Sequence, residues 1–170
     1  MKKRVVFIVA QNAFRDEELL EPKKILDNRG FEAKVAAKTR NRAVGKLGTE
    51  ITPDMAVAEV KPQDFDAAVF IGGPGAVSYF NDGEVLQLVR DFRAKRKLIG
   101  AICIAPSILA NAGILISKTV TAFPSEEENL KDRGADYTGM PVEVDDLIVT
   151  AKDPAAAKEF GERLAYLLEG

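Results

Sequence analysis

The single cysteine of this sequence, Cys103, follows an apolar segment and precedes a proline-initiated helical segment. A nucleophile elbow is a sharp strand-to-helix turn that needs small residues two positions before and two after the nucleophile. Ala101 and Ala105 meet this requirement, and Pro106 suits the first turn of a helix. We therefore predict that Cys103 is a nucleophile whose pKa is lowered by the helix N-terminus, which favours the thiolate. The alternative is a buried cysteine that packs as a small hydrophobe.

A glycine-rich turn, residues 72–75, also follows a buried apolar segment and precedes a helix. One interpretation is a phosphate-binding loop, but its spacing matches neither a Walker loop nor a dinucleotide fingerprint, which argues against that interpretation. Because glycine permits close backbone approach, the N–H of Gly73 is predicted to point toward the cysteine turn. With the N–H of Ile104 it would form an oxyanion hole. A plain turn is the alternative.

A carboxylate is expected at the same end of the sheet. Asp16, Glu17 and Glu18 come soon after the first apolar segment, and Pro22 follows four residues after Glu18. Pro22 cannot donate to the carbonyl of Glu18, so the helix is expected to bend there and to aim a carboxylate inward. Acidic residues in a first helical turn are also favoured by the helix dipole alone.

The elements that must position these residues alternate along the chain. Apolar or alternating segments predict strands at 5–10, 31–37, 67–71, 98–102 and 119–122, with small hairpins at 45–51 and 142–150. Helices are predicted from about 16 to 29, after a cap at Asn81, at 106–112, after a Ser125–Glu128 capping box, and from the Asp153-Pro154 cap to about 168. This alternation predicts an α/β fold, a flavodoxin-like parallel sheet with helices on both faces and a small hairpin, in one domain over residues 1–170. Ligands of such sheets bind at the carboxyl ends of the strands.

Composition narrows the function classes. The 170 residues are 46% hydrophobic and 29% charged with a net charge of −2, so a nucleic-acid partner is not expected. No segment approaches the roughly 20 apolar residues of a membrane span, and no signal peptide is evident. One cysteine cannot form an internal disulfide, which favours a cytoplasmic protein. The sequence contains no histidine, so acids and bases must be carboxylates, Lys, Tyr, Cys or water.

Together these residues resemble the PfpI family, the superfamily of intracellular protease I and the Parkinson-disease-associated deglycase, which is similar in fold to class I glutamine amidotransferases. The resemblance runs from the first strand through Phe14-x-Asp16-x-Glu18-Leu19-x-x-Pro22, Gly72-Gly73 and Ala101-Ile102-Cys103 to the last helix. It implies that Cys103 is the nucleophile, that Glu18 is a protonated carboxyl hydrogen-bonded to it, and that the N–H groups of Gly73 and Ile104 form the anion pocket. It also implies a homo-oligomer, a dimer or hexamer.

This sequence departs from the family pattern at two positions. The protease branch carries His directly after the cysteine, where this chain has Ile104, and the deglycase branch carries His where this chain has Phe123. A homo-oligomer cannot supply the missing imidazole, so Glu18 and Cys103 would carry the chemistry by themselves.

The sequence leaves three main functions open, and a related hydratase acting on other small electrophiles is a minor fourth. The first is a glutathione-independent, glyoxalase- or deglycase-type enzyme in which Cys103 attacks a small reactive carbonyl compound and Glu18 shuttles a proton. The second is a cysteine peptidase or amidase acting on a peptide substrate. The third is a redox-sensing or stress-protective protein without turnover. None of the three requires a cofactor or a metal.

Overall fold

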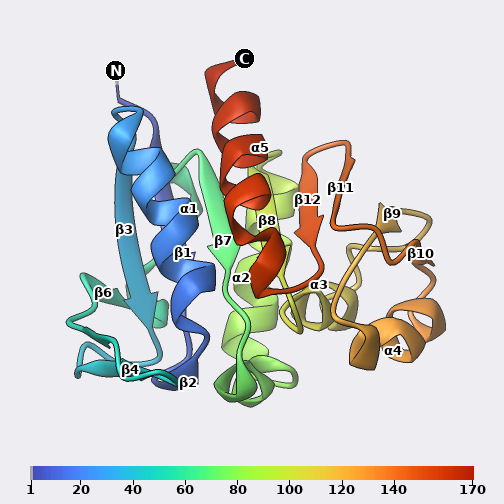
Figure 1. Ribbon diagram of the computed structural model, residues 1–170, viewed down its shortest axis with the longest axis horizontal. Helices are drawn as coiled ribbons and strands as arrows, with labels where there is room; N and C mark the ends of the chain where they lie inside the picture. The colour runs from blue at the N-terminus through green and yellow to red at the C-terminus, as the bar shows by residue number, and fades with distance from the viewer. Residues whose placement is uncertain (1) are drawn as a thin grey trace.

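The computed structural model describes residues 2–170 of the chain (Figure 1). Strands occupy β1 Arg4–Ile8, β2 Asn12–Phe14, β3 Glu32–Ala37, β4 Ala43–Gly45, β5 Glu50–Ile51, β6 Met55–Ala56, β7 Ala67–Phe70, β8 Leu98–Ile102, β9 Thr119–Val120, β10 Asp136–Tyr137, β11 Val142–Asp145 and β12 Ile148–Ala151. The α-helices are α1 Asp16–Asn28, α2 Gly83–Ala94, α3 Pro106–Asn111, α4 Glu127–Asp132 and α5 Ala157–Glu169. Short 3-10 helices are η1 Val57–Glu59, η2 Pro62–Asp64, η3 Pro74–Tyr79, η4 Pro124–Glu126 and η5 Pro154–Ala156.

A central sheet of these residues has seven strands in the order β11-β12-β8-β7-β1-β3-β6. All neighbouring pairs are parallel except β11 and β12, which form an antiparallel hairpin at one edge. Strand β1 is apolar throughout its centre because successive side chains alternate between two buried faces. Val5 and Phe7 enter one hydrophobic cluster, whereas Val6 and Ile8 enter the other. The predicted flavodoxin-like sheet is therefore confirmed.

Helices cover both faces of this sheet (Figure 1). Helices α1 and α5 lie side by side on one face, and α2 and α3 lie on the other. The α1–α5 contact is close at Gly161, where an added Cβ would lie 2.8 Å from the Cα of Pro22. The arrangement places the first turn of α1 and the loops after β1, β7 and β8 at the same edge of the sheet, the carboxyl edge.

Two smaller units flank the central sheet. Strands β2, β4 and β5 form a three-stranded sheet that contains the predicted hairpin, and β9 pairs with β10. The prediction of a strand at 119–122 is thus correct only for Thr119–Val120, which lies outside the central sheet. Strand β10 pairs with β9 over two residues only, and the N–H of Thr121 donates to the hydroxyl of Thr150 at 2.9 Å instead of extending this pairing.

Two predicted helix caps are wrong. Asp82, not Asn81, caps α2, and its carboxylate accepts the N–H groups of Glu84 at 3.0 Å and Val85 at 3.2 Å. Ser125 does not cap α4, because its hydroxyl donates to the carboxylate of Glu126 at 2.7 Å. In contrast, Asp153 caps the start of the last helical region as predicted, by accepting the N–H of Ala156 at 3.1 Å. Contacts with neighbouring side chains therefore decide which of several candidate residues caps a helix.

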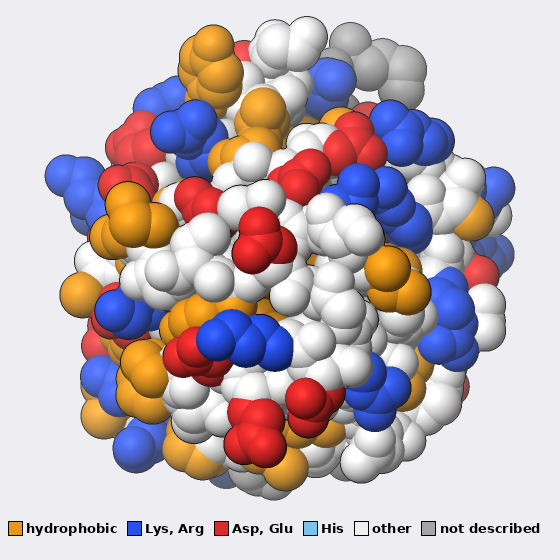
Figure 2. All heavy atoms as spheres, turned by 90° about the vertical axis from the view of Figure 1, so that its right-hand side faces the viewer, with side chains coloured by type: hydrophobic (Ala, Val, Ile, Leu, Met, Phe, Trp, Pro, Cys, Tyr) orange, Lys and Arg blue, Asp and Glu red, His pale blue; other side chains and the backbone are white. Residues whose placement is uncertain are grey.

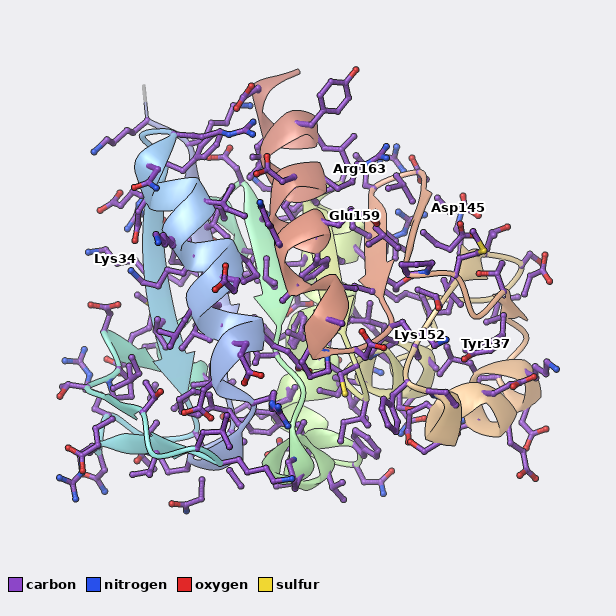
Figure 3. All side chains as sticks on the ribbon, viewed as in Figure 1. Lys34, Tyr137, Asp145, Lys152, Glu159 and Arg163 are labelled. Carbon is purple, nitrogen blue, oxygen red and sulfur yellow. The ribbon has the colours of Figure 1, made fainter. Side chains whose placement is uncertain are left out.

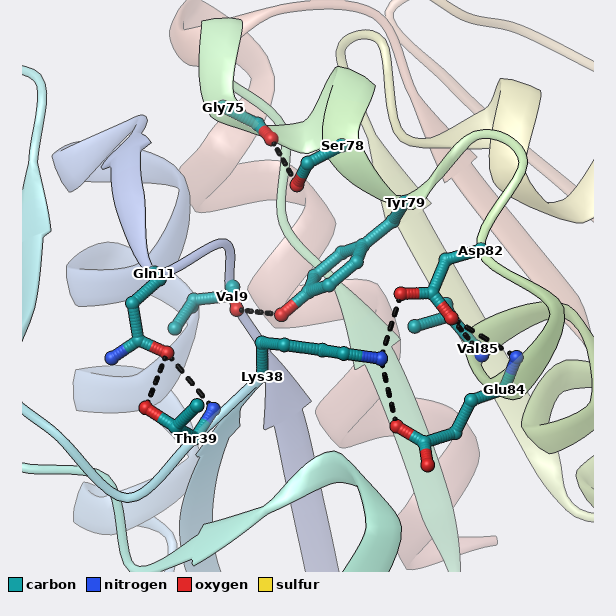
Figure 4. A network of polar contacts seen from close by, with 10 residues as sticks. All are labelled: Val9, Gln11, Lys38, Thr39, Gly75, Ser78, Tyr79, Asp82, Glu84 and Val85. Atoms are coloured by element: carbon teal, nitrogen blue, oxygen red, sulfur yellow. Dashed lines mark hydrogen bonds and ion pairs between the residues drawn. The ribbon is translucent and has the colours of Figure 1, made fainter.

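A polar network fixes the carboxyl edge near η3 (Figure 4). The buried Tyr79 hydroxyl donates to the carbonyl of Val9 at 2.7 Å. Lys38, just after β3, contacts the carboxylates of Asp82 at 2.8 Å and Glu84 at 2.9 Å. Helix η3, which begins directly after Gly73, is therefore attached to the end of β1 through Tyr79, and the start of α2 is attached to the end of β3 through Lys38.

Charged side chains are distributed over the outside of the molecule. Lys34 on β3 and Glu159 and Arg163 on α5 project away from the layers (Figure 3). On the face that carries β9, β10, β11 and α4, Lys and Arg are interspersed with Asp and Glu (Figure 2). Among residues 2–170, every helix falls short of the length and apolarity that a membrane crossing demands.

Candidate functional site

Cys103 occupies the turn between β8 and α3 with a backbone φ of 65°. This left-handed conformation is unusual for a residue with a side chain, and such strain is typical of a nucleophile elbow. The turn is held by the N–H of Cys103, which donates to the carbonyl of Ala151 at 2.9 Å, and by its carbonyl, which accepts the N–H of Phe123 at 2.8 Å. Ala101 and Ala105 are fully buried on either side. Cys103 is largely buried, with 9% of its surface exposed, and it lines a cavity.

Glu18 lies beside this cysteine. It comes from the first turn of α1 and is 0% exposed. One carboxyl oxygen, Oε1, accepts the N–H of Gly72 at 2.9 Å. The other, Oε2, is buried without a hydrogen-bond partner among the described residues, and the carboxyl lies close enough to the Cys103 thiol for each group to shift the pKa of the other. Glycine is required at position 72, because an added Cβ would lie 2.6 Å from Glu18 Oε1 and 2.8 Å from the Cβ of Cys103.

Burial dominates the proton affinities of the pair. It raises the pKa of Glu18 to about 8, although the Cys103 thiol and the N–H of Gly72 act in the opposite direction. Near neutral pH the carboxyl is therefore mostly protonated, and it can donate to sulfur through Oε2. Because the two groups interact directly, their titrations are coupled, and the pKa of each depends on whether the other is ionised.

The predicted lowering of the Cys103 pKa is wrong. Burial, and then the Glu18 carboxylate, raise the pKa of this thiol to about 12. The N–H groups of Ile104 and Gly73 lower it, but they do not outweigh burial. The helix behind the elbow, α3, has only six residues, so its dipole gives limited stabilisation to a thiolate. With these pKa values the thiol keeps its proton near neutral pH, and the ionised form of Glu18 is the base adjacent to it.

The two N–H groups predicted to form an anion pocket both face the sulfur. Gly73 has a φ of 99°, in the region that favours glycine, and an added Cβ would lie 2.3 Å from the backbone nitrogen of Arg15. That nitrogen donates to the carbonyl of Gly72 at 2.9 Å, so the glycine turn is attached to the start of α1. The N–H groups of Gly73 and Ile104 have no carbonyl partner among the described residues and remain available to an oxyanion.

These four predicted residues line or border one cavity of about 270 Å³. The structure thus brings together Cys103, Glu18, Gly73 and Ile104, and their catalytic roles remain predictions. The cavity has further lining residues that sequence reasoning did not assign to the site, namely Arg15, Lys46, Pro74, Phe123, Ser125 and Pro154. Nothing in the local sequence links position 46 to position 103. Arg15 could have been assigned to the site from the sequence, because it directly precedes the acidic first turn of α1.

A polar cluster on α3 and η4 supports one wall of the cavity. The buried hydroxyl of Ser107 donates to Glu126 at 2.6 Å and accepts from the amide of Asn129 at 3.1 Å. These contacts hold the segment that contains Phe123 and Ser125 against the helix that follows Cys103. Among residues 2–170, no group of three or more His, Cys, Asp or Glu side chains is arranged to hold a metal ion.

Comparison with known proteins agrees with this geometry. The family model described as the DJ-1/PfpI family matches residues 3–166. The chain belongs to the DJ-1/PfpI family. An uncharacterized protein of Methanocaldococcus jannaschii is 38% identical to this DJ-1/PfpI protein over 169 residues, which is 98% of this chain and 82% of the relative. An uncharacterized protein of Staphylococcus aureus is 34% identical over 172 residues, 99% of this chain and 100% of the relative.

Solved structures show the same fold for the whole DJ-1/PfpI domain. A ThiJ/PfpI domain protein from Brachyspira murdochii has a TM-score of 0.96 and 31% identity, with 99% of this chain and 98% of that chain covered. DJ-1beta from Drosophila melanogaster has a TM-score of 0.91 and 28% identity, covering 99% and 91% of the two chains. The resemblance inferred from the motifs is confirmed. Within this DJ-1/PfpI site, Phe123 and Ile104, and not imidazoles, lie beside the cysteine.

Proposed function

We propose that this protein is a cysteine-dependent enzyme that converts small 2-oxoaldehydes into 2-hydroxy acids without glutathione. The observation that carries the proposal is the buried pair of Glu18 and Cys103, in which an acid with a pKa of about 8 lies against the only thiol. A group of this pKa can both accept and return a proton near neutral pH, which is the requirement for general acid–base catalysis.

The first step is addition of sulfur to the aldehyde. The Cys103 thiol gives its proton to the Glu18 carboxylate as sulfur bonds to the aldehyde carbon, C1. Negative charge develops on the aldehyde oxygen, and the N–H groups of Gly73 and Ile104 stabilise it. Glu18 then passes the proton to this oxygen, which leaves a neutral hemithioacetal and an ionised Glu18.

The second step moves hydrogen between the two carbons. The Glu18 carboxylate removes the proton from C1 as the electron pair forms the C1–C2 double bond, and Glu18 passes this proton to the ketone oxygen to give an enediol. The Glu18 carboxylate then takes the hydroxyl proton from C1 and delivers a proton to C2, which gives a thioester of a 2-hydroxy acid. Water then cleaves the carbon–sulfur bond and restores the thiol. The sum is R–CO–CHO plus water to R–CHOH–COOH, so C1 is oxidised, C2 is reduced and no external oxidant is needed.

The other two functions have less support. Peptide hydrolysis needs an acid for the leaving amine, and with Glu18 already holding the thiol proton the chain has no imidazole to share the task. Redox sensors usually rely on a low-pKa, accessible thiolate. The raised pKa and the 9% exposure of Cys103 are unfavourable for that role.

Turnover of methylglyoxal by purified protein tests the proposal. We expect lactate from the wild type, none from Cys103→Ser, and a loss of about 100-fold or more in kcat from Glu18→Gln, the range typical of a positioned acid–base group. In D2O the lactate should carry deuterium at C2, because Glu18 exchanges its proton with solvent. Unchanged methylglyoxal, or equal turnover by Cys103→Ser, would contradict the proposal.

A further inference from the structure

Two cationic side chains line the mouth of the Cys103 cavity, Arg15 and Lys46. Arg15 is held in place by Glu17, which accepts two hydrogen bonds from its guanidinium at 2.8 and 2.9 Å. The single carboxyl among the cavity-lining residues is Glu18, which is mostly protonated near neutral pH because burial raises its pKa to about 8. The charge that faces the cavity is therefore positive.

Lys46 is positioned by the hairpin between β4 and β5. Its N–H donates to the carbonyl of Phe14 at 2.8 Å, and the N–H of Gly45 donates to the carbonyl of Thr49 at 2.8 Å. The carboxylate of Asp16 accepts the N–H groups of Leu47 at 2.8 Å and Thr49 at 2.9 Å. The backbone on both sides of Lys46 is thus attached to the strand and helix that lead to Glu18.

The hairpin that carries Lys46 packs so closely against Asp16 that only glycine fits at position 45. An added Cβ there would lie 2.5 Å from Oδ2 of Asp16. Such contacts fix where the lysine side chain leaves the backbone, which is the kind of support that binding residues need.

The charges around the cavity leave one cation without a partner. Glu17 balances Arg15, and Asp16 is occupied by the backbone N–H groups of the hairpin. No ion pair to Lys46 is found among residues 2–170, although its side chain borders the cavity. A single uncompensated positive charge beside an apolar wall of Ile104, Phe123 and Pro154 suits a small monoanion with an apolar stem.

We propose that the molecule that reacts at Cys103 carries a carboxylate, which Lys46 binds at the cavity mouth with support from Arg15. This inference rests on the proposed function only for the identity of the group that reacts with sulfur, which would be a 2-oxoaldehyde. Lys46 is a specificity-determining residue in this scheme. It does not touch the atoms that change bonds, and it selects the charged substrate by electrostatic attraction.

Alkylation of the thiol tests this selectivity without relying on turnover. Cys103 is the only cysteine in the chain, so mass spectrometry reports its reaction alone. Iodoacetate and iodoacetamide have the same reactive carbon and differ in charge. We expect the iodoacetate-to-iodoacetamide rate ratio, divided by that of N-acetylcysteine, to exceed one at low salt and to fall toward one as salt screens the charge.

Variants assign the effect to Lys46. Lys46→Met should lower the ratio about threefold or more at low salt, and Lys46→Arg should restore it. Lys158→Met is the matched control, because it removes an exposed lysine of α5 and should leave the ratio unchanged. A wild-type ratio equal to that of N-acetylcysteine, or one that Lys46→Met does not alter, overturns the inference.

A substrate comparison extends the test to turnover. For 4,5-dioxopentanoate and its uncharged analogue 2-oxopentanal, the ratio of kcat/KM values should fall in Lys46→Met as the alkylation ratio does. If methylglyoxal and both these compounds are left unchanged while alkylation still depends on Lys46, the proposed function fails and the carboxylate selectivity stands. If these compounds are consumed and neither turnover nor alkylation depends on Lys46, the proposed function stands and the carboxylate selectivity fails.

Discussion

The carboxyl of Glu18 lies against the thiol of Cys103 and is anchored there by the N–H of Gly72 at 2.9 Å. Helix α1 supplies the acid and the β8–α3 turn supplies the sulfur, so the site exists only when the first and central parts of the chain are folded together. Burial raises both pKa values, to about 8 for Glu18 and about 12 for Cys103. Glu18 has the lower pKa and therefore ionises first, and its charge then disfavours ionisation of the thiol.

Stability should fall as pH rises through the slightly acidic and neutral range. The pKa of Glu18 is raised in the folded protein from 4.5 to about 8, so the folded state binds this proton more tightly than the unfolded state. The resulting stabilisation is complete below about pH 4.5 and is lost as pH approaches and passes 8. The free energy of unfolding should decrease by up to about 1.4 kcal/mol per pH unit within that window.

Glu18→Gln provides the control for this pH dependence. The amide can still accept the N–H of Gly72 but does not titrate, so its urea midpoint should change little between pH 5 and 8. The pKa values of Asp16 and Glu17 are lowered, so these neighbours titrate below the window. If the urea midpoints of the wild type and the variant change with pH in parallel, Glu18 does not carry the raised pKa.

Alkylation of Cys103 should be slow at neutral pH and should rise as pH passes about 8. At pH 7 the thiol keeps its proton, since its pKa is raised to about 12, and only a minor fraction of Glu18 is ionised and able to accept that proton. Ionisation of Glu18 then supplies a base next to sulfur. The rate constant for iodoacetamide, followed by mass spectrometry from pH 6 to 10, should show this inflection in the wild type and lose it in Glu18→Gln. Reaction faster than that of free cysteine at pH 7 would indicate a preformed thiolate.

Replacement of Gly72 should disrupt the site and the fold together. In Gly72→Ala the new Cβ would lie within 2.6–2.8 Å of Glu18 Oε1, the carbonyl of Ile102 and the Cβ of Cys103. Overpacking of this kind costs about 1–3 kcal/mol or more. Gly83→Ala is a matched control, because nothing lies within 4 Å of its added Cβ at the start of α2. Chemical denaturation should show a marked decrease in the free energy of unfolding for Gly72→Ala and a change of less than about 0.5 kcal/mol for Gly83→Ala.

Much of the fold followed from local pattern. The apolar segment at 98–102 is β8, and the alternating segment near Val35 is β3. The elbow was predictable because Ala101, Cys103 and Ala105 are close in sequence, and a sharp turn constrains close neighbours. Glu18 followed from its place after the first strand, and its pairing with Cys103 from the family pattern.

What could not be predicted depends on contacts between distant segments. Lys46 reaches the cavity only because Asp16 and Phe14 bind the backbone of its hairpin. The pKa of Cys103 was predicted in the wrong direction because burial is set by the surrounding layers, whereas the helix N-terminus is visible in the local sequence. Asp82 replaced Asn81 as a cap for a similar reason, since Lys38, just after β3, holds its side chain.

The buried hydroxyl of Tyr79 should contribute to the placement of the glycine turn. Tyr79→Phe removes its hydrogen bond to the carbonyl of Val9 and leaves that carbonyl without this donor at the end of β1. The expected loss of stability is about 1–2 kcal/mol. Because η3 carries both Tyr79 and the residues after Gly73, amide exchange in η3 should also accelerate. Tyr166→Phe, at a residue 68% exposed, is the control and should be neutral.

Asp16 should control the hairpin that carries Lys46. Burial works to raise the pKa of this carboxyl, but hydrogen bonds from Thr49 and Leu47 outweigh it and lower the pKa, so both oxygens are engaged as a carboxylate at neutral pH. Asp16→Ala leaves two backbone N–H groups without their acceptor, at a cost of about 1–3 kcal/mol each where they are buried. Amide exchange at Leu47 and Thr49 should accelerate sharply, while exchange in α5 rises only as far as global stability falls.

Asp16→Asn should lie between the wild type and Asp16→Ala, because an amide has one carbonyl oxygen and can accept at only one of the two positions with full strength. The contribution of Asp16 should also weaken as pH falls, since a carboxyl with a lowered pKa stabilises the folded state above its unfolded value of 3.8 and loses that effect in acid. The iodoacetate-to-iodoacetamide ratio at Cys103 should follow the same order of variants. If the hairpin amides loosen while that ratio is unchanged, the lysine does not depend on its hairpin for position, and its selectivity must come from long-range charge alone.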